Sequence, residues 1–224
     1  MTVALSTLEP SLRIELPGIL EPVLNDAIVR VVRQFFWRSE AWKYTADNGL
    51  DYTINQAYFT APVAGTDIPA DTLVKRVDTV KYNSDGSSWD KELAFKTKDE
   101  LDRENADWET ETGTSPSYWT INGNGVARPV PIASATVTDG VLLRVVIVPD
   151  PSLLVLPDFL FYEFEEVFKA GVLGQLMKQP GKDWTDIKMS VFYTAMFDDG
   201  IKNAKSRAEA SFGQPKDTMA YGGL

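Results

Sequence analysis

The sequence contains neither cysteine nor histidine. Without cysteine the chain cannot form a disulfide, a zinc–thiolate site or a thiol nucleophile. Without histidine it lacks the Ser-His-Asp and Cys-His arrangements, histidine metal ligands and the side chain that most often transfers protons near neutral pH. Catalysis by carboxylates, lysine or tyrosine remains open. The two absences nevertheless favour a protein that is not an enzyme and that uses no metal or cofactor.

Long apolar runs are absent too. No stretch of about 18 apolar residues could span a bilayer, and the first residues, "MTVALSTLEPSLRIELPG", lack a basic segment followed by an apolar core. We therefore expect a soluble, unsecreted chain with no membrane partner. With 224 residues, of which 44% are hydrophobic, it can build one domain with an inserted module or two small domains.

Positive charge is in the minority, with 22 basic against 32 acidic residues and a net charge of −10. Proteins that wrap nucleic acid draw their affinity from clustered Lys and Arg, so this balance argues against specific DNA binding. It does not argue against enclosing DNA. A negatively charged wall repels the phosphate backbone and lets a duplex pass without sticking.

A helical pattern runs from Ile19 to Lys43, where apolar residues come in adjacent pairs four positions apart. This spacing places them along one side of a helix, as a broad stripe that faces a core. Pro22 fits because it falls in the first turn, where its missing N–H has no partner to lose. The pairs are Ile19 and Leu20, Val23 and Leu24, Ala27 and Ile28, Val31 and Val32, and Phe35 and Phe36.

After Asn48-Gly49 the pattern changes to short alternating pieces that are typical of strands. Thr97, followed three residues later by Glu100, is a capping-box signature and predicts a short helix over "KDELDRENADW". The apolar run "VLLRVVIVPDP", residues 141–151, predicts the most buried strand. The other expected strands are "YTINQAYF", "LVKRVDTVKYN", "ELAF", "YWTI" and "VARPVPI".

The stretch "YWTINGNGVARPVPI" could contain either a phosphate-binding loop or the turn of a β-hairpin. A phosphate loop needs a helix directly after its glycines. Here the prolines that follow Gly125 prevent one, whereas Asn122-Gly123 suits a tight turn between strands. The sequence predicts a hairpin.

Beyond Pro157 the helical period returns as a hairpin of two helices broken at Pro180-Gly181. The second helix, from about Trp184 to Ala210, would be roughly 40 Å long. That is more than a small domain needs, and it suggests packing against another subunit. The polar end of the chain is either a frayed terminus or a tail that orders on a partner. Its apolar anchors would be Phe212, Met219, Tyr221 and Leu224.

The fold class expected from these elements is α+β, with a β-rich module inserted into a helical bundle and an extended C-terminal tail. Residues 1–48 form an N-terminal arm and the first bundle helix, and residues 49–156 the module with one short helix. Residues 157–212 form the helical hairpin that completes the bundle, and residues 213–224 the tail.

Candidate chemistry is limited to carboxylates and aromatic rings. Acidic residues such as Glu163 and Glu166 share a helix face but have no marked opposing partner, so solvated surface is favoured over glycan cleavage. Trp108, Tyr118 and Trp119 could fill a core, lie in a protein interface or stack on sugar rings. For Trp119 the core is favoured.

The order of the pieces resembles the head-to-tail adaptor (connector) proteins of tailed bacteriophages, in the group found between portal and tail in short-tailed phages. The similarity extends from about Leu16 to about Gly213. It rests on "IVRVVRQFFWRSEAWKY", "IPADTLVKRVDTVKYNSDG", "GTSPSYWTINGNGVARPVPIAS", "LLRVVIVPDPSLLVLPD" and the closing "FEEVFKAGVLGQLMKQPGKDWTDIKMSVFYTAMFDDGIKNA". The first fifteen or so residues depart from the best-known members.

The resemblance implies a structural virion protein, made in the host cytoplasm, that forms a ring under the portal at the head-tail junction. The ring would be dodecameric, would continue the DNA channel and would offer a platform for nozzle or tube proteins of the tail. Its portal-binding tail would carry Phe212, Met219, Tyr221 and Leu224. Tail-side or inter-subunit contacts would come from Trp108, Tyr118, Trp119, Asn122, Asn124 and Arg128.

Two other functions remain open from the sequence. A tail-completion protein would form a similar ring but assemble on the tail tube rather than on the portal. A carbohydrate-binding or glycan-cleaving module would present Trp108 or Trp119 as an aromatic platform in a cleft.

Overall fold

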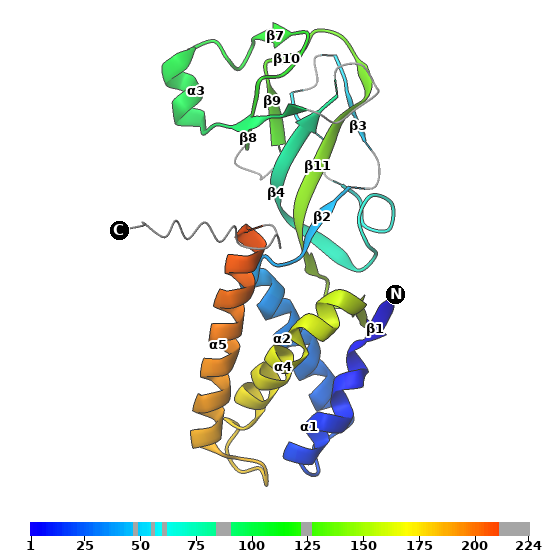
Figure 1. The fold of residues 1–224 in the computed structure, drawn as a ribbon, viewed down its shortest axis with the longest axis vertical. Coiled ribbons are helices and arrows are strands. Elements are labelled where there is room, and N and C mark those ends of the chain that lie inside the picture. Colours follow the sequence, from blue (N-terminus) through cyan, green and yellow to red (C-terminus); the bar gives the residue numbers. More distant parts are fainter. Residues whose placement is uncertain (47–48, 55–56, 60–61, 84–90, 122–126, 211–224) are drawn as a thin grey trace, which may run out of the picture. The chain divides into compact units, whose positions relative to one another are not determined.

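A computed structural model describes residues 1–46, 49–54, 57–59, 62–83, 91–121 and 127–210 (Figure 1). These residues form a mixed α+β structure, which confirms the expected fold class. The chain divides into two compact units. One, which we call the helical unit, holds Met1–Ala41 and the chain from Leu154 onward, and the other, the β unit, holds Trp42–Leu153.

The helical unit is built on α2 (Glu21–Ser39), α4 (Asp158–Leu176) and α5 (Ile187–Glu209). Pro22 lies in the first turn of α2 as expected. The helix ends before Lys43 because Glu40 adopts a left-handed conformation, with φ of 55°, and donates its N–H to the Phe36 carbonyl at 3.1 Å. The expected stripe supplies the buried side of α2, which includes Leu24, Ala27, Ile28, Val31, Val32, Phe35 and Phe36.

Phenylalanine rings fill the space among the three helices. The ring centroid of Phe35 in α2 lies 4.7 Å from that of Phe164 and 5.1 Å from that of Phe168, both in α4. The ring of Phe197 in α5 lies 6.5 Å away. Aromatic pairs at these separations attract one another beyond the gain from burying their area. The core of the helical unit is therefore an aromatic cluster that joins all three helices.

The N-terminal residues form β1 (Thr2–Ala4), the 3-10 helix η1 (Leu5–Leu8) and α1 (Glu9–Glu15). β1 pairs antiparallel with β12 (Val155–Pro157), which directly precedes α4. The side chains of Leu8, Leu12 and Leu16 are buried in the helical unit. The start of the chain is thereby held beside a segment that lies about 150 residues further on.

The main sheet of the β unit has the strand order β2 (Lys43–Thr45), β11 (Val137–Pro149), β4 (Thr72–Tyr82) and β5 (Lys91–Glu92). A further strand, β3 (Leu50–Tyr52), also pairs with β11, and all these pairs are antiparallel. Every residue of β11 from Val145 to Pro149 is buried. The apolar run is thus a buried strand at the centre of the sheet, as predicted.

A smaller three-stranded sheet carries the hairpin. β8 (Tyr118–Ile121) lies between β6 (Ala94–Phe95), which is parallel to it, and β9 (Ala127–Val130), which is antiparallel. β7 (Thr112–Gly113) pairs with β10 (Ile132–Ala133). The short helix α3 (Lys98–Glu104) begins with the capping box predicted from Thr97 and Glu100.

Two predicted elements are shorter than expected. Of the strand predicted over "YTINQAYF", only Tyr52 lies in a strand, at the end of β3, where it pairs with Val137 at the start of β11. The prediction was wrong for residues 53–54 and 57–59, and residues 55–56 lie outside the described residues. The helix predicted over "KDELDRENADW" ends at Glu104, since Asn105 has extended dihedral angles. Trp108 therefore lies in the turn after α3 rather than on the helix.

Candidate functional site

The residues predicted to contact the tail or a neighbouring subunit surround the β8–β9 hairpin. Asn122 and Asn124 lie outside the described residues, as do the tail anchors Phe212, Met219, Tyr221 and Leu224. The antiparallel pairing of β8 with β9 confirms the hairpin over a phosphate-binding loop, because a strand and not a helix follows the glycines.

Trp108 and Arg128 form one buried contact beneath the hairpin. Trp108 is only 3% exposed, and its indole Nε1 donates a hydrogen bond to the Asp102 carboxylate at 2.7 Å. The guanidinium carbon of Arg128 lies 4.7 Å from the centre of the Trp108 ring and 5.5 Å from that of Tyr58. Arg128 also donates a hydrogen bond to the backbone oxygen of Glu109. A cation held between two rings and a carbonyl fixes the turn after α3 against β9.

Tyr118 and Trp119 are consecutive residues of β8, so their side chains point to opposite faces of the hairpin sheet, and Tyr118 packs against the buried cluster of Leu101, Trp108 and Val130. The Trp119 ring is buried and meets Phe95 of β6 edge to face, with 4.9 Å between ring centroids. The ammonium group of Lys96 lies 3.6 Å above the Tyr118 ring and also pairs with Glu104. The hydrogen bond to Glu104 raises the pKa of Lys96 above its ordinary value, so the ammonium stays charged over Tyr118.

Most of the aromatic side chains predicted to make contacts are therefore not on the surface. Trp108, Trp119 and Arg128 face the interior of the β unit, and only Tyr118 is partly exposed. Neither indole is available to stack on a sugar ring. The exposed aromatic side chains here are instead Phe95, at 50%, and Tyr58, at 40%.

The exposure of Phe95 could not be predicted, because alternation does not say which face of a two-residue strand is covered. That of Tyr58 could not be predicted either, because Tyr58 lies outside the strands and its surroundings depend on the tertiary fold. Tyr58, Trp108 and Arg128 line a small hollow of about 130 Å³ beside the hairpin. Among the described residues, the buried Nε of Arg128 has no hydrogen-bond partner. The hollow therefore has one exposed aromatic ring, that of Tyr58, beside the buried Trp108 ring and the buried Arg128 cation.

A second surface lies on α5, in the helical unit. Ser190, Phe197, Ile201, Ala204 and Ala208 make its buried side, at spacings of three, four or seven residues. The first ten residues of the helix nevertheless also expose large apolar side chains on the other side, to between 38% and 63%. These are Ile187, Met189, Val191, Phe192 and Met196, which we call the α5 apolar face.

The second half of α5 presents charge instead. Asp198 accepts a hydrogen bond from Arg38 of α2 at 2.7 Å, and Asp199 pairs with Lys202 at 2.9 Å. A long helix that is apolar on its outer side only at one end is unusual for a solvated surface, because exposed apolar patches of this kind mark interaction sites. The apolar period predicted a long helix here, but it did not predict this division between an apolar half and a charged half.

The carboxylates considered for catalysis serve the fold. Glu163 pairs with Arg207, which joins α4 to α5, and Glu165 and Glu166 both pair with Lys169. Asp186 caps α5 by accepting a hydrogen bond from the backbone N–H of Met189 at 3.0 Å. Over the part of the chain that the structure describes, no group of acidic residues could hold a metal ion. Within the same residues, no helix is long and apolar enough to cross a membrane.

Comparison with known proteins gives one family. The family model described as SU10 adaptor protein matches residues 3–218, which is nearly the whole chain. The comparison with curated proteins gave no match. The chain therefore belongs to the SU10 adaptor protein family, and it is a structural phage adaptor of the head-tail junction.

Proposed function

We propose that the protein is a head-to-tail adaptor of the short-tailed phage type, which assembles as a ring beneath the portal and continues the DNA channel. The ring is expected to be dodecameric and to carry tail proteins on its distal side. The α5 apolar face is the observation that supports assembly most directly. It is a patch that a single chain leaves in water and that a neighbouring copy would cover.

Burial of the α5 apolar face against a second copy would contribute substantially to the free energy of association. Each large apolar side chain gains about 1.5–3 kcal/mol when it passes from full exposure to full burial. The members of the α5 apolar face are half-exposed and lie within ten residues of one another, so a neighbour could bury them together. In an acidic chain, which repels other copies at long range, such a patch gives a short-range attraction.

The portal and the tail would be met by different parts of the chain. α5 ends at Glu209 and leads directly into the segment that carries Phe212, Met219, Tyr221 and Leu224, and we assign these residues to portal anchoring. We assign the hairpin region, with the exposed rings of Phe95 and Tyr58, to tail-side contacts. The net charge of −10 suits a channel wall past which DNA slides without specific binding.

The test is the mass of the purified chain by light scattering, alone and mixed with portal rings. A portal-bound complex with the mass of a ring of this chain is expected. Deletion of residues 213–224 should abolish the complex and leave the circular dichroism spectrum unchanged. A chain that stays monomeric and does not bind the portal would overturn the proposal. A ring that forms only on the tail tube would instead favour a tail-completion protein.

A pair of substitutions on α5 tests the assembly surface separately. Phe192→Asp puts a charge in the middle of the α5 apolar face and should prevent ring formation without changing thermal stability. Asn203→Asp adds the same charge to the exposed polar half of the same helix and should leave assembly intact. Equal behaviour of the two variants would show that the α5 apolar face is not an interface.

A further inference from the structure

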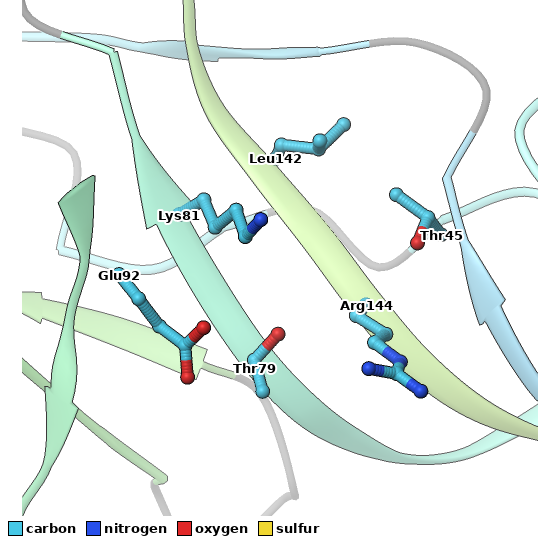
Figure 2. A pocket seen from close by; sticks show the side chains of 6 residues that line it. All are labelled: Thr45, Thr79, Lys81, Glu92, Leu142 and Arg144. Carbon is cyan, nitrogen blue, oxygen red and sulfur yellow. The ribbon is translucent and has the colours of Figure 1, made fainter. Parts of the chain in front are cut away.

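One face of the main sheet in the β unit carries polar and charged side chains from four strands. Arg144 of β11 lies opposite Thr45 of β2 on one side and Thr79 of β4 on the other. In the next row along the sheet, Lys81 of β4 lies between Leu142 of β11 and Glu92 of β5. Figure 2 shows these six side chains around one hollow. Residues that alternate with them, such as Val80 and Leu143, are buried on the opposite face. We call the polar side the basic face.

The basic face is positively charged although the chain as a whole is acidic. Its centre is Asp78, whose carboxylate lies 3.1 Å from the Lys43 ammonium, 3.4 Å from the Arg76 guanidinium and 3.6 Å from Nε of Arg144. One carboxylate thus faces three cations. With Lys81 and Glu92 included, the face has four basic and two acidic residues.

The hollow on this face has a volume of about 150 Å³. In Figure 2 the Thr79 side chain lies between the carboxylate of Glu92 and the guanidinium of Arg144. Among the described residues, the ammonium group of Lys81 forms no ion pair and no hydrogen bond. Lys81 and Arg144, with the hydroxyl groups of Thr45 and Thr79, supply donors that suit a carboxylate.

The complementary surface lies elsewhere on the same unit. Residues 98–111, which include α3, hold seven acidic and two basic residues, a net charge of −5. Most of these carboxylates have partners within the chain, such as Glu104 with Lys96 and Glu109 with Lys98. Within the described part of the chain, the side chains of Asp99 and Asp107 have none. Figure 1 shows α3 and β2 in different parts of the β unit.

We propose that the basic face of one copy receives the acidic segment 98–111 of the next copy, with Asp99 or Asp107 entering the hollow beside Lys81 and Arg144. The proposal rests on the ring function proposed above. Two different patches of one unit, each meeting the other patch on a second copy, make a head-to-tail contact, which closes into a ring when the rotation between copies allows it. The contact would order the β units around the ring.

A nucleic acid is a poorer occupant of this face. Duplex DNA is held by many Lys and Arg residues along its backbone, whereas this face has a net charge of only about +2 and includes Glu92 in the lining of the hollow. A hollow of about 150 Å³ accommodates one carboxylate side chain better than a run of phosphates. The acidic segment of a second copy matches both its size and its sign.

A charge swap tests the contact. Lys81→Glu should weaken ring assembly on the portal by about tenfold, and Asp99→Lys combined with Asp107→Lys should do the same, because each places like charges together. Combining all three changes should restore assembly. The matched control, Lys205→Glu, changes an exposed lysine on α5 and should have no effect.

The absence of cysteine allows a second, independent readout. A chain with Lys81→Cys, mixed with a chain with Asp99→Cys, should be joined by a short bifunctional maleimide within assembled rings. A linker is needed because a lysine–aspartate pair holds its Cβ atoms further apart than the roughly 4 Å of a disulfide. A chain with Lys205→Cys should not be joined to the Asp99→Cys chain.

The outcomes separate this inference from the proposed function. Failure of the unchanged chain to form any ring would overturn both. Rings of normal mass and stability with Lys81→Glu, and no cross-link, would overturn the inference alone. A Lys81→Glu variant that assembles normally but loses binding of DNA or of a tail protein would also overturn it, in favour of that other occupant.

Discussion

At the scale of single residues, Glu100 shows how the start of α3 is fixed. Its carboxylate accepts hydrogen bonds at 2.8 Å from both the backbone N–H and the hydroxyl group of Thr97. The Thr97 hydroxyl oxygen accepts in turn from the Glu100 N–H at 3.3 Å. These hydrogen bonds from Thr97 lower the pKa of Glu100 below its ordinary value, because they stabilise the ionised form.

The lowered pKa of Glu100 predicts a specific pH dependence. A group whose pKa is lower in the folded state contributes stability above its unfolded pKa and loses it as the pH falls through the folded value. Thr97→Ala should therefore raise the pKa of Glu100 and reduce the free energy of unfolding near neutral pH. The difference between wild type and variant should narrow as the pH falls below about 4.

This prediction is measured by NMR titration of the Glu100 side chain and by denaturant unfolding at several pH values. Glu100→Gln is the control, because it removes the titrating group. In the Glu100→Gln variant, the change in the free energy of unfolding caused by Thr97→Ala should no longer depend on pH through the titration of residue 100. A Glu100 pKa that is the same with and without the Thr97 hydroxyl would contradict the assignment.

The same region shows which residue properties could be predicted. The spacing of Thr97 and Glu100 predicted the capping box, since both partners are local. The burial of Trp108 and Arg128 could not be predicted, because it depends on how the turn after α3 lies against β9, twenty residues away. Their role in contacts with other proteins stays a prediction.

At the scale of elements, Gly171 sets how closely the helices of the helical unit approach. A Cβ atom at this position would lie 2.5 Å from Cγ1 of Val31 in α2 and 2.7 Å from Cδ2 of Phe197 in α5. Both distances are below contact distance. Helix propensity alone favours alanine over glycine by about 1 kcal/mol. Packing and propensity therefore make opposite predictions for one substitution.

We expect packing to decide, because the neighbours of Gly171 belong to the buried core. Gly171→Ala should lower the free energy of unfolding by about 1–2 kcal/mol, as overpacking outweighs the gain in propensity. The measurement is denaturant unfolding followed by circular dichroism. Ala195→Gly on the exposed side of α5 is the control for propensity and should cost about 1 kcal/mol. A Gly171→Ala variant more stable than wild type would show that the helices can move apart.

The long elements could be predicted and the short ones could not. α2, α4, α5 and β11 each contain enough apolar residues for the period to show, and their predicted bounds agree with the structure within a few residues. β1 has three residues, and its partner β12 lies about 150 residues further along the chain, so nothing local marks it. The unexpected end of the strand at Tyr52 has the same cause, since it depends on where β11 begins.

At the scale of the whole molecule, the β unit is inserted into the helical unit and has its own core. Tyr52 and Tyr82 are buried within it, 5.6 Å apart between ring centroids, and Tyr52 donates a hydrogen bond to the carbonyl oxygen of Pro131 at 2.5 Å. Burial raises the pKa of both phenols above their ordinary value. The backbone carbonyl of Trp42, at the start of the β unit, accepts a hydrogen bond from the backbone N–H of Ile147, near the end of that unit.

These contacts predict that residues 42–153 fold without the rest of the chain. The segment contains the whole of the main sheet and of the hairpin sheet, and its first strand, β2, pairs near the C-terminal end of β11. Expressed alone, it should give dispersed amide resonances and a single cooperative thermal transition. The same transition should be recognisable when the full chain is heated. A Tyr52→Phe variant of the isolated segment should melt at a lower temperature, because the Pro131 carbonyl loses its donor.

The contrary result would change the interpretation of the insertion. If residues 42–153 stay unfolded alone but the full chain unfolds in one step, the two units depend on each other and the β unit is not an independent module. A substitution in either unit would then alter both of the binding surfaces proposed for the portal and the tail. If the segment folds alone, Lys81→Glu and Phe192→Asp should act on assembly independently, with effects on association free energy that add within about 0.5 kcal/mol.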